Sequence, residues 1–392
     1  MLVLYGLGTI VGAGIYALVG EVAGRAGMYA PFGFLMASAL AATTVLSFAE
    51  LSARLPLSAG EAAYVREGFG VASLATFVGL VVATAGCVSA ATVANGFVGY
   101  LAELATVPRA PVIIGFTATL GLVAACGIRE SAAAVAIMTL AEVAGLVLVI
   151  AVAWPMANVG ARAAELLPPL SVGVWTGISA ASLLAFFAFL GFEDMVNVAE
   201  EVRDVTRTLP LAIVIVLVLS TALYVALATV VVLVVEPSEL AATDAPLALV
   251  YERATGSPAH VLSIISMLAM VNGALVQIVM AARVLYGLAR QGSLPAIFAR
   301  VEAATRTPAI ATAVATATVT VLALAFPLAL LAQGTSMLML VSFSLVNLSL
   351  VRMKRRGPPP EGIWRVPAPV PVVGFVVSVA FFCYGMWDLL SR

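Results

Sequence analysis

The residues with the clearest chemical potential lie in two interrupted apolar segments. One segment contains Gly12-Ala13-Gly14, and the other contains Gly191-Phe192-Glu193-Asp194. Glycine permits a helix to unwind, and unwinding frees backbone NH groups on one half-helix and carbonyl groups on the other. Free NH groups attract a carboxylate, whereas free carbonyl groups accept an ammonium. The two interruptions therefore predict a binding site for a zwitterion such as an amino acid.

Both motifs also have a plainer interpretation. Gly12 and Gly14 are compatible with close helix packing, because small residues are common where membrane helices touch. The matching interruption in the second segment favours the binding site over that alternative. Glu193 and Asp194 need water or partners at membrane depth. They either recognise a cationic substrate or stabilise the unwound segment without one, and the sequence leaves both interpretations open.

Glu142 is the third chemical candidate, because it is the only charged residue in the apolar run 132–157. A charge at the helix centre costs roughly 2.5–3.5 kcal/mol on insertion scales, so this side chain should face the protein interior. A buried carboxyl favours its neutral form and releases its proton when water reaches it, as a proton carrier requires. A hydrogen-bonded structural glutamate is the alternative. Asn272 is a candidate partner for coupling, although a simple helix–helix hydrogen bond would also explain it.

The composition requires these residues to lie inside a membrane protein. Of the 392 residues, 63% are hydrophobic and 10% are charged, whereas about a quarter of a soluble domain is charged. Cys87, Cys126 and Cys383 lie in apolar runs as expected core residues, and with the single His260 they form no zinc-ligand pattern. No Walker-type phosphate loop and no nucleophile–base pattern appears. We expect no cofactor, no metal site, no enzyme activity and no nucleic-acid partner.

The elements that position these residues must be helices. Every backbone group in hydrocarbon has to be hydrogen-bonded internally, and about 20 apolar residues cross the bilayer. The uncharged run 307–351 is too long for one crossing, so Pro327 and a turn at Ala332-Gln333-Gly334 are expected to divide it. The sequence predicts an all-α integral membrane protein with about eleven transmembrane helices, near 2–24, 28–52, 71–103, 111–128, 132–157, 173–199, 209–235, 258–289, 309–331, 334–351 and 368–390.

These spans divide into two units of five within one transmembrane transporter domain. The first five-helix repeat covers residues 1–157, the second covers residues 173–352, and one accessory helix follows at 368–390. Because five is odd, the second unit enters the membrane from the opposite face, which is the inverted-repeat arrangement of many secondary carriers. The two interruptions then fall in helices 1 and 6, the first helix of each unit.

The loop charges predict the orientation. With the N-terminus inside, 14 of the 19 Lys and Arg residues lie on the inner side, and the cluster around Lys354 is the strongest basic patch. The positive-inside rule therefore predicts a cytoplasmic N-terminus in the cell (plasma or inner) membrane. Glu50, at the inner end of the second span, is expected to join a salt-bridge network there. The outer basic residues are Arg25, Arg109, Arg162, Arg253 and Arg392.

Several motifs in these spans resemble the signatures of one family. Gly8-Thr9-Ile10-Val11-Gly12-Ala13-Gly14-Ile15-Tyr16 resembles the first-helix signature of the amino acid–polyamine–organocation (APC) superfamily. The stretch from Phe186 to Pro210 resembles its sixth helix and the following loop. The resemblance runs in order over nearly the whole chain. Its other motifs are Ser47-Phe48-Ala49-Glu50-Leu51 and Gly60-Glu61-Ala62-Ala63-Tyr64-Val65 for the second helix and inner loop, and Arg283-Val284-Leu285-Tyr286 and Asn347-Leu348 for the eighth and tenth helices.

The resemblance implies a leucine-transporter-type fold and the uptake or exchange of amino acids or amines. It implies that Gly12, Ala13 and Gly14 offer backbone groups to a substrate carboxylate. Gly191 and Phe192 would lie at the break of the sixth helix and face the amine and side chain of the substrate. Phe187, one turn earlier, falls where some members place an aromatic gate.

The sequence departs from the family pattern in two ways, and these departures limit which family properties can be expected of it. The twelfth span and most of the inner N-terminal tail that are usual in the family do not appear. Some proton-coupled members carry a lysine on the fifth helix where this chain has Glu142, so a lysine mechanism does not transfer. We expect a secondary transporter that is proton-coupled or exchanging, with Na⁺ as the other coupling ion to test. A membrane amino-acid sensor with the same fold is the alternative, and the oligomeric state stays open.

Overall fold

The computed structural model describes residues 1–56, 60–127, 132–357 and 362–391. Within these ranges the protein consists of α-helices and short 3₁₀ helices, without a strand, so the predicted all-α class is confirmed. Arg129 and Arg392, two of the basic residues counted for the orientation, lie outside the described residues.

Eight helical stretches of the described residues are long and apolar enough to cross a membrane. The apolar helices α9 (Val172–Phe187) and α14 (Ala309–Ala325) are shorter, and α1 (Leu2–Ile10) precedes the first long stretch. Each predicted span therefore contains at least one helix. The long stretches are Ala13–Arg54, which holds α2 (Ala13–Ala26), η1 (Gly27–Tyr29) and α3 (Ala30–Arg54); α5 (Ala72–Ala102); α6 (Arg109–Cys126); Val135–Ala157 within α7 (Ala132–Ala157); α10 (Val205–Val234); α13 (His260–Arg290); α15 (Leu328–Arg356); and α16 (Pro369–Leu390).

The boundary between α14 and α15 corrects one prediction. Phe326 is extended, with φ −128° and ψ 146°, and α15 begins directly after Pro327. Proline disfavours helical backbone in the residue before it and removes a donor, so this one residue is sufficient to end α14. Ala332-Gln333-Gly334, expected to be a turn, lies inside α15. A membrane helix tolerates a glycine because the backbone hydrogen bonds around that glycine still form.

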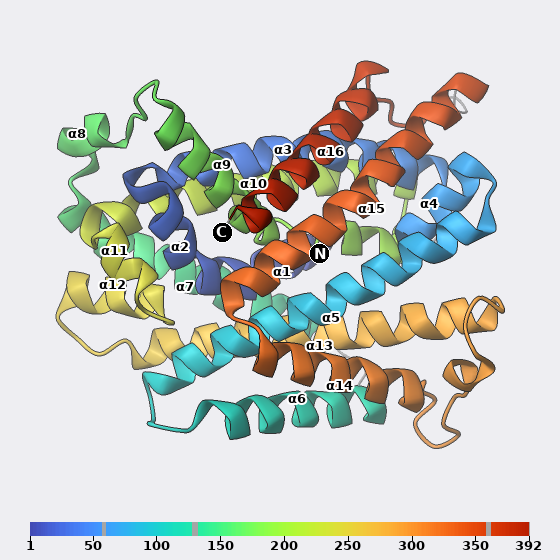
Figure 1. Ribbon diagram of the computed structural model, residues 1–392, viewed down its shortest axis with the longest axis horizontal. Helices are drawn as coiled ribbons and strands as arrows, with labels where there is room; N and C mark the ends of the chain where they lie inside the picture. Colours follow the sequence, from blue (N-terminus) through green and yellow to red (C-terminus); the bar gives the residue numbers. More distant parts are fainter. Residues whose placement is uncertain (57–59, 128–131, 358–361, 392) are drawn as a thin grey trace.

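Short helices in the predicted loops mark the two ends of the bundle. Figure 1 shows α8 (Val159–Arg162), α11 (Pro237–Ala241) and α12 (Pro246–Thr255) at one end and α4 (Gly60–Phe69) at the other. The long helices α5, α13 and α15 run between these ends. They are called the α8 end and the α4 end below.

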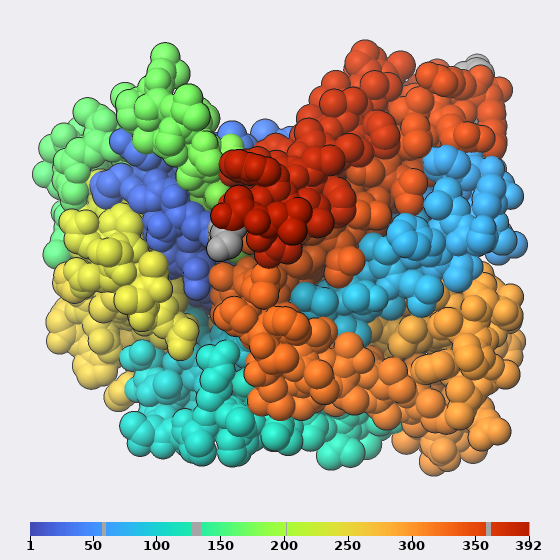
Figure 2. All heavy atoms as spheres, in the orientation of Figure 1, coloured from blue at the N-terminus to red at the C-terminus, as the bar shows by residue number. Residues whose placement is uncertain are grey.

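The outer helices of the bundle expose apolar side chains. Figure 2 shows α16 on the surface and α6 and α14 along one edge. Leu122 on α6, Val321 on α14 and Val376 on α16 are each more than half exposed, and such faces suit hydrocarbon rather than water. Cys126 and Cys383 are exposed as well, so the expectation that all three cysteines are core residues is wrong for these two. A small apolar thiol is as compatible with lipid as with a protein core.

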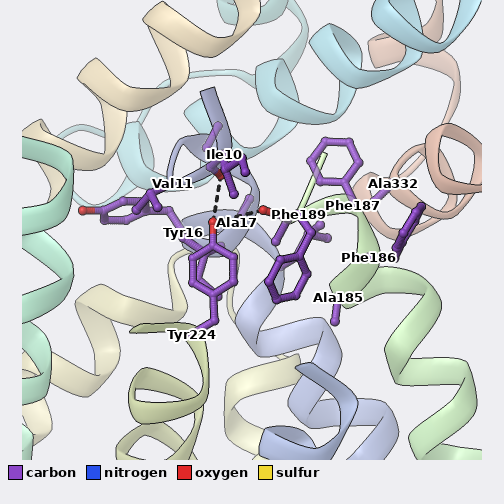
Figure 3. Close-up of a cluster of buried hydrophobic side chains, with 14 of the residues drawn as sticks. Ile10, Val11, Tyr16, Ala17, Ala185, Phe186, Phe187, Phe189, Tyr224 and Ala332 are labelled. Carbon is purple, nitrogen blue, oxygen red and sulfur yellow. Dashed lines mark hydrogen bonds between the residues drawn. The ribbon is translucent and has the colours of Figure 1, made fainter. Parts of the chain in front are cut away.

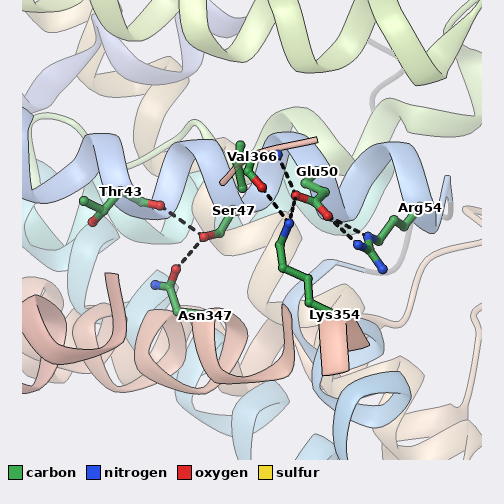
Figure 4. Close-up of polar contacts among 7 residues, drawn as sticks. All are labelled: Thr43, Ser47, Glu50, Arg54, Asn347, Lys354 and Val366. Carbon is green, nitrogen blue, oxygen red and sulfur yellow. Dashed lines mark hydrogen bonds and ion pairs between the residues drawn. The ribbon is translucent and has the colours of Figure 1, made fainter. Parts of the chain in front are cut away.

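Glu50 connects α3 to α15 and to the segment before α16 (Figure 4). Its fully buried carboxylate accepts hydrogen bonds from Arg54 Nε (2.9 Å), Lys354 Nζ (2.6 Å) and the backbone N–H of Val366 (2.8 Å). Lys354 Nζ also donates to the carbonyl of Val366 at 2.7 Å. The predicted salt-bridge network around Glu50 is therefore present, and it attaches the α16 connection to the core.

We expect Glu50→Gln to lower the free energy of unfolding by about 3–5 kcal/mol, the usual cost of breaking a buried ion pair. The substitution leaves the Arg54 and Lys354 cations close together without their shared counter-charge. Thermal melting of the detergent-purified protein measures the effect. The control is Glu165→Gln, which breaks the exposed pair with Arg162 and should change the melting temperature little. Equal melting temperatures for the Glu50 variant and wild type would contradict the assigned role.

Candidate functional site

The first break separates α1 from α2. α1 ends at Ile10 and α2 begins at Ala13, with Gly12 as the residue before the first turn (φ −96°, ψ −145°). The NH groups of the first turn of α2, from Ala13 to Ile15, have no partner within the helix. They carry the positive end of the helix dipole of a 14-residue helix. The break therefore lies where the glycine motif predicted it and presents a site for an anion.

The second break separates α9 from the 3₁₀ helix η3 (Glu193–Glu201). α9 ends at Phe187, and residues 188–192 form turns. Gly191 has φ +120°, a conformation that L side chains rarely adopt. The Glu193 carboxylate accepts a hydrogen bond from the N–H of Gly191 at 2.9 Å. Glu193 thus stabilises the unwound backbone itself, which is one of the two roles that the sequence left open.

The two breaks lie against each other. A Cβ on Gly14 would lie 3.0 Å from Ala188 Cα, and a Cβ on Gly191 would overlap the carbonyl oxygen of Thr9. The hydroxyl of Tyr224 on α10 lies 2.8 Å from the Ile10 carbonyl oxygen and 3.0 Å from that of Ala188, and it donates to both (Figure 3). One side chain thereby satisfies a carbonyl from each break.

A cavity of about 90 Å³ opens beside the paired breaks. Gly12, Ala13, Gly14, Phe187 and Asn272 are the predicted site residues that line it. Its wall also includes polar groups from the first, third, sixth and eighth predicted spans, namely Thr9, Ser89, Asp194 and Gln277. This combination of backbone NH groups, a carboxyl group and small polar side chains can hold a small zwitterion.

The three other residues predicted to bind the substrate lie outside this cavity. Gly191 packs against the Thr9 carbonyl, and Glu193 lines a smaller adjoining cavity of about 20 Å³. Phe192 is fully buried, with its ring centroid 5.5 Å from that of Phe48 and 5.2 Å from that of Phe343. Its ring therefore packs against α3 and α15 and is not part of the cavity wall, in contrast to the expectation that it faces the substrate.

Glu142 is buried in α7, next to the site but outside the cavity. Its side chain is 2% exposed, and neither carboxyl oxygen has a hydrogen-bond partner in the described part of the chain. The side chain of Asn272 lies close to the carboxyl without a hydrogen bond of normal geometry, and Asn272 also lines the cavity. Tyr16, on α2, donates to the Glu142 backbone carbonyl at 2.6 Å. Asn272 thus lies next to both the cavity and the Glu142 carboxyl.

Tyr224, Ser89 and Gln277 are site residues that the sequence analysis missed. Tyr224 stands in the apolar run of α10, and its hydroxyl at membrane depth was the available signal. Ser89 and Gln277 are polar residues within the apolar helices α5 and α13. Each is the kind of residue that must face the protein interior, although its type alone does not say which contact it makes.

Comparison with known proteins identifies relatives over nearly the whole chain. Residues 2–388 match the family profile described as amino acid permease. The chain is 30% identical over 389 residues to a vacuolar cationic amino acid transporter of Arabidopsis thaliana, covering 92% of this chain and 63% of that protein. It is 25% identical over 408 residues to a branched-chain amino acid permease of Bacillus subtilis, covering 97% of this chain and 85% of that protein. A methylthioribose transporter of the same bacterium is 24% identical over 412 residues, or 99% and 87% of the two chains. The chain thus spans less than two thirds of the plant relative.

Proposed function

This chain belongs to the amino acid permease family, within the APC superfamily, and on that basis we propose that it is a secondary transporter of amino acids or related amines. The family and its named relatives are transporters rather than enzymes. The observation that carries the proposal is the meeting of two helix breaks beside one cavity. A helix broken at mid-depth is the element from which such carriers build a substrate site.

The substrate would bind with its carboxylate at the first turn of α2. The free NH groups of Ala13 and Gly14 support this orientation, because a helix N-terminus favours a negative charge. The substrate ammonium would then lie toward the second break, where Asp194 contributes a carboxyl group to the cavity wall. Phe187, which also lines the cavity and packs against Gly14, would contact the substrate side chain.

The transport cycle would follow from two inverted repeats, residues 1–157 and 173–352, with an accessory helix at 368–390. The N-terminus would face the cytoplasm in the cell membrane, as the loop charges predict. Alternating access would then move the half-helices at the two breaks relative to the remaining helices. Coupling to protons through Glu142 is part of the proposal, with sodium coupling and exchange as its rivals.

A membrane sensor that binds the same substrate without moving it is the second candidate function. Uptake by proteoliposomes separates the two, because only a transporter accumulates or exchanges labelled substrate inside the vesicle. The relatives are named for cationic amino acids, branched-chain amino acids and methylthioribose. A panel that includes these compounds, with and without a pH gradient and with and without Na⁺, therefore tests both substrate class and coupling. Binding without uptake under every condition would favour the sensor.

Gly14→Leu should weaken substrate binding by about fivefold to a hundredfold, because overpacking a well-packed contact costs about 1–3 kcal/mol. A side chain at this position meets Ala188 Cα and the ring of Phe187 and extends into the cavity. Ligand-induced thermal shifts of the purified protein measure the affinity. Gly115→Leu on α6 is the matched control, since nothing lies within 4 Å of a Cβ there. Unchanged affinity in the Gly14 variant would remove the first break from the site.

A further inference from the structure

The two cavities beside the helix breaks have a common wall. Ser89 on α5, Leu190 at the second break and Gln277 on α13 line both the cavity of about 90 Å³ and the smaller one of about 20 Å³. A molecule bound in the larger cavity can therefore extend past these residues into the smaller one. A space of about 10–15 Å³ is enough to hold one water molecule, so the smaller cavity accepts a terminal group of that size.

Hydrogen-bond acceptors line the smaller cavity. Glu193 is 7% exposed, and its Oε2 accepts the Gly191 N–H at 2.9 Å. The Thr335 hydroxyl donates to a backbone carbonyl of its own helix at 3.1 Å, which leaves its lone pairs to accept a further hydrogen bond. The side-chain oxygen of Gln277 lies 3.2 Å from the position of a Cβ on Gly86, another residue of this wall. A group that fits among these oxygens has to be a donor.

The charges on the two walls favour a cationic donor. Glu193 lines the smaller cavity and Asp194 the larger one, and none of the described residues that line either cavity is Lys, Arg or His. Asp194 is 4% exposed, and its Oδ1 has no hydrogen-bond partner in the described part of the chain. A buried carboxylate is costly without a cation beside it. One ammonium group of a substrate can serve Asp194, and a second one is needed for Glu193.

The rest of the smaller cavity's wall is apolar. Its residues are Val82, Ala85, Gly86, Leu190, Met280 and Met339. An ammonium group at the end of a methylene chain combines an apolar stem with a charged head, so it matches a wall of both kinds. The ammonium group is close to a water molecule in size and has three donors for the surrounding oxygens. A guanidinium group, with its planar fork of nitrogens, is larger and fits this space less well.

We propose that the smaller cavity binds the terminal ammonium group of a basic amino acid such as lysine, with the Glu193 carboxylate as its counter-charge. This inference rests on the proposed transport function and narrows its substrate class to amino acids with a primary ammonium at the end of an unbranched side chain. The α-carboxylate stays at the first turn of α2 and the α-ammonium at Asp194, while the side chain passes Ser89 and Gln277. Glu193 then both stabilises the second break and recognises the substrate.

Isothermal titration calorimetry of the purified full chain with two ligands tests the pocket. L-lysine is compared with 2-aminoheptanoate, an analogue of the same length in which a methyl group replaces the terminal ammonium. Wild type should bind lysine about tenfold to a hundredfold more tightly, the effect of a hydrogen bond between charged groups. Equal affinities, or binding of neutral amino acids alone, would overturn this inference and leave the transport function in place. No binding of any amino acid would overturn both.

The ratio of the two affinities shows whether Glu193 is the group that recognises the ammonium. Glu193→Gln keeps an oxygen for the Gly191 N–H but removes the negative charge, so the preference for lysine should fall by about tenfold. Glu67→Gln, at an exposed glutamate on α4, is the matched control and should keep the wild-type ratio. A wild-type ratio in Glu193→Gln would show that this carboxyl group serves only the break.

A second variant changes the same wall without touching the break. Thr335→Val keeps the shape of the side chain and removes its acceptor oxygen from the smaller cavity. We expect it to lower the preference for lysine by about threefold to tenfold. Ser344→Ala is its control, because Ser344 also donates to its own helix but lines neither cavity. Equal ratios for Thr335→Val and Ser344→Ala would contradict the placement of the ammonium group.

Discussion

Replacing Gly191 with alanine is expected to abolish substrate transport while leaving the helical bundle folded. Two effects combine at this position. Its backbone, at φ +120°, costs an L residue about 1–3 kcal/mol of strain. In addition, the new Cβ would overlap the carbonyl oxygen of Thr9, so the second break must move away from the first. Uptake of labelled substrate into proteoliposomes measures the loss, and size-exclusion chromatography in detergent measures folding.

The control for Gly191 is a glycine that shares its backbone requirement but not its contact. Gly256→Ala provides this, since Gly256 has φ +68° and a Cβ added there would meet nothing within 4 Å. Strain alone should lower its melting temperature without changing uptake. If Gly191→Ala transports at the wild-type rate, the close approach of the two breaks is not required for function. If Gly256→Ala also loses transport, backbone strain rather than the Thr9 contact explains the effect.

Glu142→Gln is expected to eliminate gradient-driven accumulation while preserving substrate exchange. Glutamine keeps the shape and much of the hydrogen-bonding capacity of the side chain but cannot carry a proton. The carboxyl oxygens lack partners in the described part of the chain, and Asn272, which lies close to them, also lines the cavity. A gradient of one pH unit supplies about 1.4 kcal/mol per proton, enough for at most about tenfold accumulation at one proton per substrate. The variant should show no accumulation beyond equilibration.

Three measurements make the Glu142 result specific. Exchange of labelled for unlabelled substrate shows whether the binding site survives. Sodium dependence at constant pH separates proton coupling from a sodium site that uses the same carboxylate. Glu236→Gln, at an exposed glutamate near the α8 end, controls for the loss of one acidic charge. Accumulation by Glu142→Gln in an imposed pH gradient would show that Glu142 is not the proton carrier.

The helix breaks were the most predictable part of the site. A glycine motif or an acidic pair inside an apolar run conflicts with a continuous membrane helix, so the chain must unwind near it. α1 accordingly ends two residues before Gly12, and α9 ends four residues before Gly191. The all-α class and the superfamily followed from composition and from ordered motifs. The repeat symmetry, the number of crossings and the orientation stay predictions.

Contacts between distant segments were not predictable in the same way. Phe192 was expected to face a substrate. However, residues 188–192 form turns that lead into a 3₁₀ helix. Successive side chains of a 3₁₀ helix are rotated further about the helix axis than those of an α-helix, so the Phe192 ring points in a different direction. That ring therefore meets Phe48 and Phe343 instead. Tyr224 was missed because its role arises only when α10 packs beside both breaks. A single apolar run contains no information about which carbonyl its tyrosine will reach.

The Tyr224 hydroxyl lies between two backbone carbonyl groups, and this position affects which conformations of the two breaks are populated. If the two breaks moved independently of each other, the protein would also sample mixed conformations, in which one break is displaced and the other is not. In such a mixed conformation, the Tyr224 hydroxyl keeps one of its acceptors, Ile10 or Ala188, and loses the other. A buried carbonyl left unpaired costs about 1–3 kcal/mol, which lowers the population of each mixed conformation by about fivefold to a hundredfold. The two breaks would then exchange between states in one cooperative step, and the kinetics of opening would show a single relaxation rather than two.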